Sequence, residues 1–246
     1  MTTFSDVLAA QLKGDPGRPL VTFYDDATGE RVELSVTTYA NWVAKAASML
    51  VDQHELERGD TLRIDLPPHW LGPVFLGAAW TAGLTVCDYD ANLDGQSPDA
   101  VVCGPDELPA WAERAGELPV LACSLLPLGV RFAEPVPPDV HDVGIDIWSQ
   151  PDSFIPWDPP GDDDLAYDLL GETVTQAQLW ATAAAGSLVT DGGRLLSEAN
   201  PASPPGIATF TEPLARGGSL IQVVQADRER IEATYVAERA TARFPA

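Results

Sequence analysis

A run of three aspartates, Asp162, Asp163 and Asp164, is the densest group of potential metal ligands in the sequence. Carboxylate oxygens are the ligands that Mg²⁺ and Ca²⁺ prefer in proteins. Consecutive side chains alternate in direction along an extended chain, however, and they rarely converge on one ion. We therefore expect this run to lie in a solvated loop rather than to hold a metal.

Two glycine-rich segments are of the kind that can hold a phosphate or present a nucleophile. Gly217-Gly218-Ser219 lacks the Gly-x-Ser-x-Gly spacing of hydrolases. Gly192-Gly193 is too short to surround a phosphate with backbone N–H groups. The sequence thus nominates no catalytic residue, no cofactor-binding residue and no metal ligand, and it implies no cofactor.

The cysteines and histidines also lack a spacing typical of chemistry. Three cysteines lie in short apolar runs: Cys87, Cys103 and Cys123. Their odd number and wide spacing favour buried free thiols over a redox or metal role. Three histidines lie far apart along the chain, without an i, i+4 partner or a nearby cysteine pair that would suggest zinc: His54, His69 and His141. We expect them to be structural or surface residues.

The composition excludes several classes of partner. The chain has 246 residues and a formal net charge of −23, from 37 Asp and Glu against 14 Lys and Arg. A field of this sign repels phosphate backbones and anionic lipids, so we expect neither a nucleic-acid nor a membrane partner. The first residues lack the features of a signal peptide, and no apolar run reaches the roughly 18–20 residues of a membrane-spanning helix. The sequence therefore predicts an acidic, cytoplasmic protein.

Predicted strands and helices alternate along most of the chain. This alternation favours an α/β fold of three αβα layers with mainly parallel sheets. We expect a first sheet region over residues 1–126, a Pro- and Asp-rich connection without regular structure over 127–161, and a second sheet region over 162–246, together forming one compact unit. A helix is expected to open the chain over residues 1–11.

A succession of segments in the first part of the chain resembles a known family. The segments are Pro19-Leu20-Val21-Thr22-Phe23, Glu33-Leu34-Ser35, the amphipathic stretch from Tyr39 to Leu50, Gly59-Asp60-Thr61-Leu62-Arg63-Ile64, and Trp80-Thr81-Ala82-Gly83-Leu84-Thr85-Val86. Their order and spacing resemble the opening of adenylate-forming (AMP-binding) enzymes of the acyl-CoA synthetase and adenylation-domain type. A weaker resemblance resumes at residues 163–167 and 174–185. The layout also resembles small actinobacterial proteins that correspond to a truncated N-terminal half of such an enzyme.

The resemblance implies a reaction for which this chain lacks the residues. The family holds ATP with a Ser-, Thr- and Gly-rich loop that ends in Pro-Lys-Gly. Here a strand expected over 165–170 runs almost directly into a helix expected from Thr173, and only Gly171 remains of a loop. Asp168 and Glu172 flank this glycine and would repel a triphosphate. The family's adenine, ribose and catalytic-lysine segments belong to a later half without a counterpart here.

Three functional hypotheses follow. The first is a pseudoenzyme that keeps the scaffold and binds a partner protein or a small molecule, with self-association, for example as a dimer, covering apolar surface. The second is an acyl-activating half-enzyme completed by another chain. The third is a structural protein whose connection folds over the former cleft, with Trp148 and Trp157 filling it. Fold resemblance alone does not choose among them.

Overall fold

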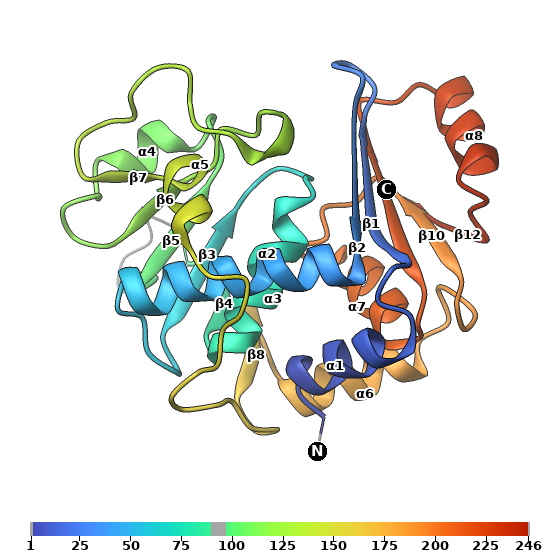
Figure 1. Cartoon of the computed structure of the whole chain (residues 1–246), viewed down its shortest axis with the longest axis horizontal. Coiled ribbons are helices and arrows are strands. Elements are labelled where there is room, and N and C mark those ends of the chain that lie inside the picture. Colours follow the sequence, from blue (N-terminus) through green and yellow to red (C-terminus); the bar gives the residue numbers. More distant parts are fainter. Residues whose placement is uncertain (1, 90–96, 246) are drawn as a thin grey trace.

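Two β-sheets with helices packed between and around them make up the chain in a computed structural model that describes residues 2–89 and 97–245 (Figure 1). Helices α2 and α3 lie in the centre of the view, while α1, α6 and α7 lie together below the five-stranded sheet. This arrangement is the α/β fold with parallel sheets flanked by helices that the sequence predicts. Met1, where the first helix was expected to begin, lies outside the described residues.

The larger sheet has seven strands in the order β7-β6-β5-β3-β4-β8-β9. Its strands are β3 (Thr61–Asp65), β4 (Thr85–Cys87), β5 (Ala100–Cys103), β6 (Val120–Ala122), β7 (Val140–Asp142), β8 (Leu165–Leu169) and β9 (Glu172–Thr175). Neighbouring strands run parallel except for the antiparallel β8–β9 pair.

The smaller sheet has five strands in the order β12-β10-β11-β1-β2. Its strands are β1 (Pro19–Asp25), β2 (Glu30–Ser35), β10 (Arg194–Ser197), β11 (Ser219–Val224) and β12 (Ala242–Phe244). Only the β1–β2 hairpin is antiparallel.

Eight α-helices connect the described strands. They are α1 (Phe4–Gly14), α2 (Val36–Ser48), α3 (Leu71–Ala82), α4 (Leu108–Ala112), α5 (Val143–Asp146), α6 (Gln176–Ala185), α7 (Ile207–Ala215) and α8 (Arg228–Ala237). A π-helical turn, Met49–Gln53, extends α2, and short 3₁₀ turns lie at Pro127–Gly129 and Ile147–Ser149. Within the described residues, none of these helices has the length and apolar character needed to cross a bilayer.

The strands are not divided between the two sheets as the sequence predicts. The seven-stranded sheet takes β8 and β9 from residues after 161, and the five-stranded sheet takes β1 and β2 from the start of the chain. The expected assignment of one sheet region to residues 1–126 and the other to 162–246 is therefore wrong. The reason is the parallel pairing of β1 with β11, which covers the free edge of the opening hairpin with a strand from residues 219–224.

The connection over residues 127–161 is more ordered than the sequence predicts. Val140 and Asp142 are buried, and β7 adds the outer strand next to β6. The Asp142 side chain then accepts from Gly144 N (2.9 Å) and caps α5. Three-residue strands and one-turn helices are too short to show a periodic pattern, which explains why the sequence analysis missed them.

A cluster of aromatic rings between the helices holds the two sheets on one core. Phe4 contacts both Trp80 and Trp180, at ring-centroid distances of 5.8 and 5.9 Å, and the two tryptophan rings lie 5.6 Å apart. Trp80 is completely buried, and its Nε1 donates to the carbonyl oxygen of Ala166 (2.8 Å). This hydrogen bond joins α3 to β8. Helix α1, through Phe4, and strands of both sheets therefore belong to one core.

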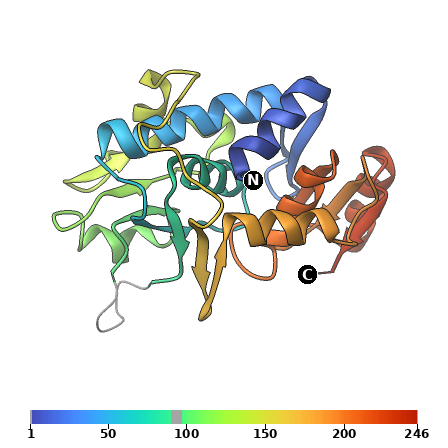
Figure 2. The ribbon, with the colours of Figure 1, turned by 90° about the horizontal axis from the view of Figure 1, so that it is seen from below.

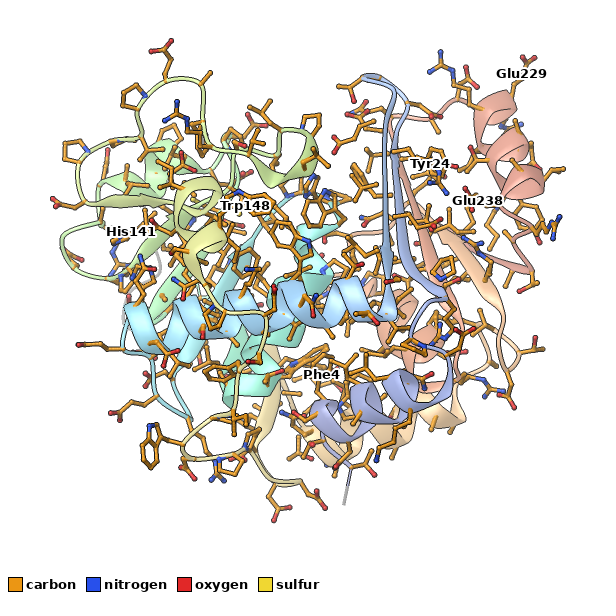
Figure 3. All side chains as sticks on the ribbon, in the orientation of Figure 1. Phe4, Tyr24, His141, Trp148, Glu229 and Glu238 are labelled. Carbon is orange, nitrogen blue, oxygen red and sulfur yellow. The ribbon has the colours of Figure 1, made fainter. Side chains whose placement is uncertain are left out.

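A cluster of charged side chains lies between the five-stranded sheet and the end of α8 (Figure 3). Glu238, at the end of α8, accepts from Arg31 (2.9 Å) and from Arg194 (2.9 Å). The Tyr24 hydroxyl also donates to Glu238. With only 10% of its side chain exposed, Glu238 joins α8 to β1, β2 and β10.

Candidate functional site

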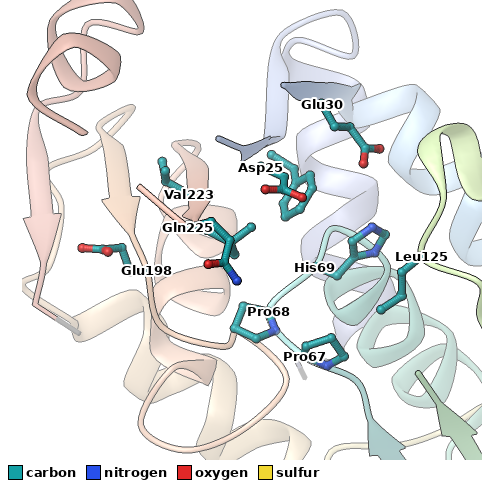
Figure 4. A pocket seen from close by; sticks show the side chains of 11 residues that line it. Asp25, Glu30, Pro67, Pro68, His69, Leu125, Glu198, Val223 and Gln225 are labelled. Atoms are coloured by element: carbon teal, nitrogen blue, oxygen red, sulfur yellow. The ribbon is translucent and has the colours of Figure 1, made fainter. Parts of the chain in front are cut away.

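A cavity of about 400 Å³ lies between the two sheets where their strands end (Figure 4). The lining residues follow the carboxyl ends of β1, β3, β6, β10 and β11, together with the start of β2: Phe23, Asp25, Glu30, Pro67, Pro68, His69, Leu125, Glu198, Val223, Val224 and Gln225. In α/β folds this edge of a sheet is the usual place for a ligand. We therefore treat this cleft as the candidate functional site.

His69 is the most buried polar side chain of the cleft, with 4% of its surface exposed. Its Nδ1 accepts from the Leu71 backbone N–H (3.3 Å), and its ring lies 4.9 Å from that of Phe23. Burial lowers the pKa of His69 to about 3, although Asp25 opposes this shift. The imidazole is therefore neutral, and because Nδ1 is the acceptor, Nε2 carries the hydrogen. Nε2 is buried and has no hydrogen-bond partner.

Three carboxylates give the cleft a negative charge, and among the described residues that line it there is no lysine or arginine. Asp25 is held by its own turn, where it accepts from Ala27 N (2.9 Å) and Thr28 Oγ1 (3.0 Å). Burial and the nearby Asp25 charge raise the pKa of Glu30. Glu198 is exposed at the end of β10. A cleft of this charge disfavours anions and suits neutral or cationic groups.

A two-residue turn lies where the sequence resemblance predicts the family's phosphate loop. Leu170 and Gly171 join β8 to β9 with φ angles of 53° and 76°. In Figure 2 this hairpin, in gold, extends away from the body of the molecule. The helix expected from Thr173 instead begins at Gln176, because residues 172–175 pair with β8 and Thr175 then caps the helix. The left-handed turn and three β-branched residues in succession favour this hairpin.

Carboxylates surround the turn. The Leu170 backbone N–H donates to Asp88 Oδ2 (2.7 Å), and the Tyr89 hydroxyl donates to Asp168 Oδ2 (2.9 Å). The hydrogen bond to Asp168 and burial raise the pKa of Tyr89 to about 12. Glu172 is exposed on the second strand. Residues 165–175 contain no lysine or arginine.

The aspartate run, the glycine pairs and the cysteines discussed in the sequence analysis do not form one site in the structure. Asp162 accepts from Thr2 N (3.1 Å), Asp164 pairs with Arg58 (2.9 Å), and Asp163 is exposed, so the three aspartates diverge as expected. The glycine pairs meet where Ser219 N donates to Gly193 O (3.0 Å), which is a structural turn. The three cysteines are buried free thiols, as predicted.

The two tryptophans proposed to fill the cleft do not do so. Trp157 is fully exposed, and Trp148 is 54% exposed with its ring 5.5 Å from that of Trp42. Neither residue lines the cleft between the sheets. The connection therefore packs on α2 through Trp148, and the plugging role proposed for Trp148 and Trp157 is wrong for this cleft.

One group of potential metal ligands could not be recognised in the sequence, because its members lie far apart along the chain. The rings of His54 and His141 lie 4.3 Å apart, and Asp146 lies beside them. Burial, with His141 adding to it, lowers the pKa of His54 to about 4. The sequence carried no local signal of this proximity, because His141 belongs to the short strand β7.

Solved structures with the same fold are acyl-CoA synthetases and ligases. A Brucella canis acyl-CoA synthetase matches 99% of this chain with a TM-score of 0.76 and 17% identity, and the match covers 52% of that protein. A benzoate CoA ligase from Burkholderia xenovorans matches with a TM-score of 0.76 and 16% identity over 99% of this chain and 50% of that one. The N-terminal domain of FACL13 from Mycobacterium tuberculosis, bound to an inhibitor, matches with a TM-score of 0.72 and 15% identity, over 98% of this chain and 62% of that one. The chain thus spans about half the length of the synthetases.

A relative of matching length was found by sequence. No protein-family profile matches the chain. A Mycobacterium tuberculosis protein described as a TIGR03089 family protein is 34% identical over 249 residues, which cover 98% of this chain and 97% of that protein. Because this identity extends over nearly all of both proteins, the chain belongs to the TIGR03089 family, with the fold of the N-terminal part of acyl-CoA synthetases.

Proposed function

We propose that this chain is a non-catalytic relative of the acyl-CoA synthetases whose cleft binds a neutral or cationic small molecule. The observation that carries the proposal is the Leu170-Gly171 turn, which leaves no loop to surround a triphosphate. The fold itself is that of the synthetases. Loss of the phosphate site with retention of the scaffold is typical of a pseudoenzyme.

Charge supports the loss of ATP binding. Asp88, Asp168 and Glu172 lie at or beside the turn, where the family places the phosphates of ATP. At about 4 Å, each carboxylate would oppose a phosphate charge by about 1–4 kcal/mol, according to how far water screens the pair. A lysine, which in the family offsets this charge, does not occur after Lys45.

The cleft between the sheets supports a ligand of the opposite character. Its walls combine apolar Phe23 and Val223 with the exposed carboxylate of Glu198. Its volume of about 400 Å³ lies within the range of small-molecule sites. A ligand with an apolar ring and an ammonium group would place its ring on the apolar wall and its positive charge near the carboxylates.

Two measurements test this proposal. ATP–pyrophosphate exchange with a panel of carboxylic acids should stay at background, and acid-dependent exchange would overturn the non-catalytic assignment. Calorimetry should then show that benzylamine binds more tightly than benzoate, which has the same ring and the opposite charge. Glu198→Gln should weaken benzylamine by about 2–5-fold, as expected of an exposed ion pair. Preferential binding of benzoate would contradict the proposed ligand class.

The second candidate is an acyl-activating half-enzyme completed by another chain. One observation favours it: the chain covers only 52% of the Brucella canis synthetase and 50% of the benzoate CoA ligase. This hypothesis predicts that a second protein restores both nucleotide binding and exchange. The acidic turn between β8 and β9 disfavours it, because a completing chain would have to supply the phosphate contacts and also offset local carboxylates.

We further propose that the protein associates with itself or with a protein partner through the β8–β9 edge. Leu170 is 77% exposed at the turn and Leu165 is 37% exposed on β8. Strand β9 is the outer strand of its sheet, and exposed outer strands favour pairing with another chain. The cytoplasmic location and the absence of nucleic-acid and membrane partners remain predictions from sequence.

A further inference from the structure

Three potential metal ligands from different elements meet at the side of the seven-stranded sheet that ends in β7. His54 directly follows the π-helical turn Met49–Gln53, His141 is the middle residue of β7, and Asp146 is the last residue of α5. Figure 3 shows His141 at the outer margin of the molecule, far from Tyr24 and Glu238. The group is thus separate from the cleft between the sheets, and neither histidine of the group lines that cleft.

The ligand atoms are already close. One nitrogen from each imidazole and one carboxylate oxygen all lie within 4.8 Å of one another. The His54 and His141 rings are 4.3 Å apart at 72° to each other, and His141 Nδ1 is 3.8 Å from Asp146 Oδ2. At 3.8 Å this contact is too long for a hydrogen bond and is a loose ion pair at most.

One imidazole of the group, on the partly buried His54, has a ring nitrogen that is free to bind a ligand. His54 Nε2 is buried and has no hydrogen-bond partner. A buried polar nitrogen without a partner is unfavourable, whereas an imidazole nitrogen that binds a metal ion is satisfied.

The Asp146 oxygen that faces His141 also accepts a hydrogen bond from a neighbouring amide. Gln53 Nε2 donates to Asp146 Oδ2 (3.0 Å), and Gln150 Nε2 donates to Gln53 Oε1 (2.8 Å). Metal-binding carboxylates are commonly oriented by such an outer layer of hydrogen bonds. The amide chain connects the segment after α2 with the end of the connection.

We propose that His54, His141 and Asp146 bind a divalent transition-metal ion, with Zn²⁺ as the best match. Two imidazoles and one carboxylate are a common zinc donor set, whereas Mg²⁺ and Ca²⁺ prefer oxygen ligands alone. Tetrahedral Zn²⁺ places ligand atoms about 3.3 Å apart, so the longest separation must shorten by about 1.5 Å at most. The His141 side chain is 40% exposed and has room for this adjustment.

The ion would add a further link between two parts of the chain that already contact each other through Gln53, Asp146 and Gln150. His54 belongs to the segment that follows α2, while His141 and Asp146 belong to β7 and α5 in the connection. A metal ion here would therefore fix the outer strand of the larger sheet to the helical layer. Its fourth position would face solvent, because the side chains of His141 and Asp146 are 40% and 23% exposed.

The test is titration of the metal-free full chain with Zn²⁺, by calorimetry and by thermal unfolding, with Co²⁺ absorption to report the coordination geometry. We expect one ion per chain, a dissociation constant of about 10 μM or lower, and a higher unfolding temperature with Zn²⁺. Mg²⁺ at the same concentration should leave the unfolding temperature unchanged.

Variants separate this site from general attraction of cations to an acidic protein. His141→Ala and Asp146→Asn change partly exposed side chains and should weaken Zn²⁺ by about 10-fold or more. Asp139→Asn removes an exposed carboxylate two residues before His141 and should bind Zn²⁺ like the unaltered chain. Equal Zn²⁺ affinity in His141→Ala and in Asp139→Asn would overturn the proposal, as would several weak ions per chain. Neither result bears on ATP binding, so this inference fails or stands independently of the proposed function.

Discussion

Replacement of His69 by asparagine should remove a large part of the protein's sensitivity to acid. His69 is 4% exposed, its pKa is lowered to about 3, and its Nδ1 accepts from Leu71 N–H. An asparagine oxygen can take over that bond, while the amide does not titrate. The variant thus isolates the proton-binding difference between the folded and unfolded chains.

The magnitude follows from the two pKa values. The unfolded chain binds a proton at His69 near the ordinary pKa of 6.5, and the folded chain does so only near 3. Because the unfolded state binds more protons between these values, the stability due to neutral His69 is present above pH 6.5 and is lost as the pH falls. Between pH 8 and pH 5 the loss amounts to about 2 kcal/mol of the free energy of unfolding.

Urea unfolding followed by tryptophan fluorescence, at pH 8 and pH 5 and with a chelator present, measures this loss in both proteins. The unaltered chain should lose about 2 kcal/mol more than His69→Asn over this interval, since all other groups are common to both. If both proteins lost the same stability within about 0.5 kcal/mol, the buried, neutral state assigned to His69 would be refuted.

Three further predictions concern the core and the surface. Glu238→Gln should lower the free energy of unfolding by about 2–4 kcal/mol because it leaves two arginines without their shared carboxylate, whereas Glu229→Gln on the exposed side of α8 should change it by less than about 1 kcal/mol in the same urea assay. Light scattering should show a dimer that Leu170→Lys converts to monomer, and a monomeric unaltered chain would contradict self-association through the β8–β9 edge. Burial raises the pKa of Cys87 to about 11 and of Cys103 to about 12, so a thiol reagent should react only after urea is added, and rapid labelling of the folded chain would contradict their burial.

Much of the fold could be predicted because long segments carry regular patterns. The helix expected over residues 1–11 and the strand expected over 165–170 lie within a few residues of the observed bounds of α1 and β8. The assignment of strands to sheets could not be predicted, because the pairing of β1 with β11 depends on tertiary contacts rather than on local sequence. Strand β7 and helix α5 were missed because they have only three and four residues, which is too short for a periodic pattern in the sequence.

The candidate sites were less accessible to sequence reasoning. The cleft gathers single residues from the ends of five strands, and only the fold brings Asp25, His69 and Glu198 together. The pairing of His54 with His141 requires β7, which the sequence did not reveal. The short link after β8 could be predicted, because the distance between an expected strand and the next expected helix is a local property of the sequence.

Calorimetric titration of the full chain with millimolar Mg²⁺·ATP, with AMP and coenzyme A alongside, tests the central claim most directly. The two-residue turn and its carboxylates predict no saturable heat with ATP. Saturable binding with a dissociation constant below about 100 μM, equivalent to about −5.5 kcal/mol, would contradict the claim that this scaffold has lost its nucleotide site.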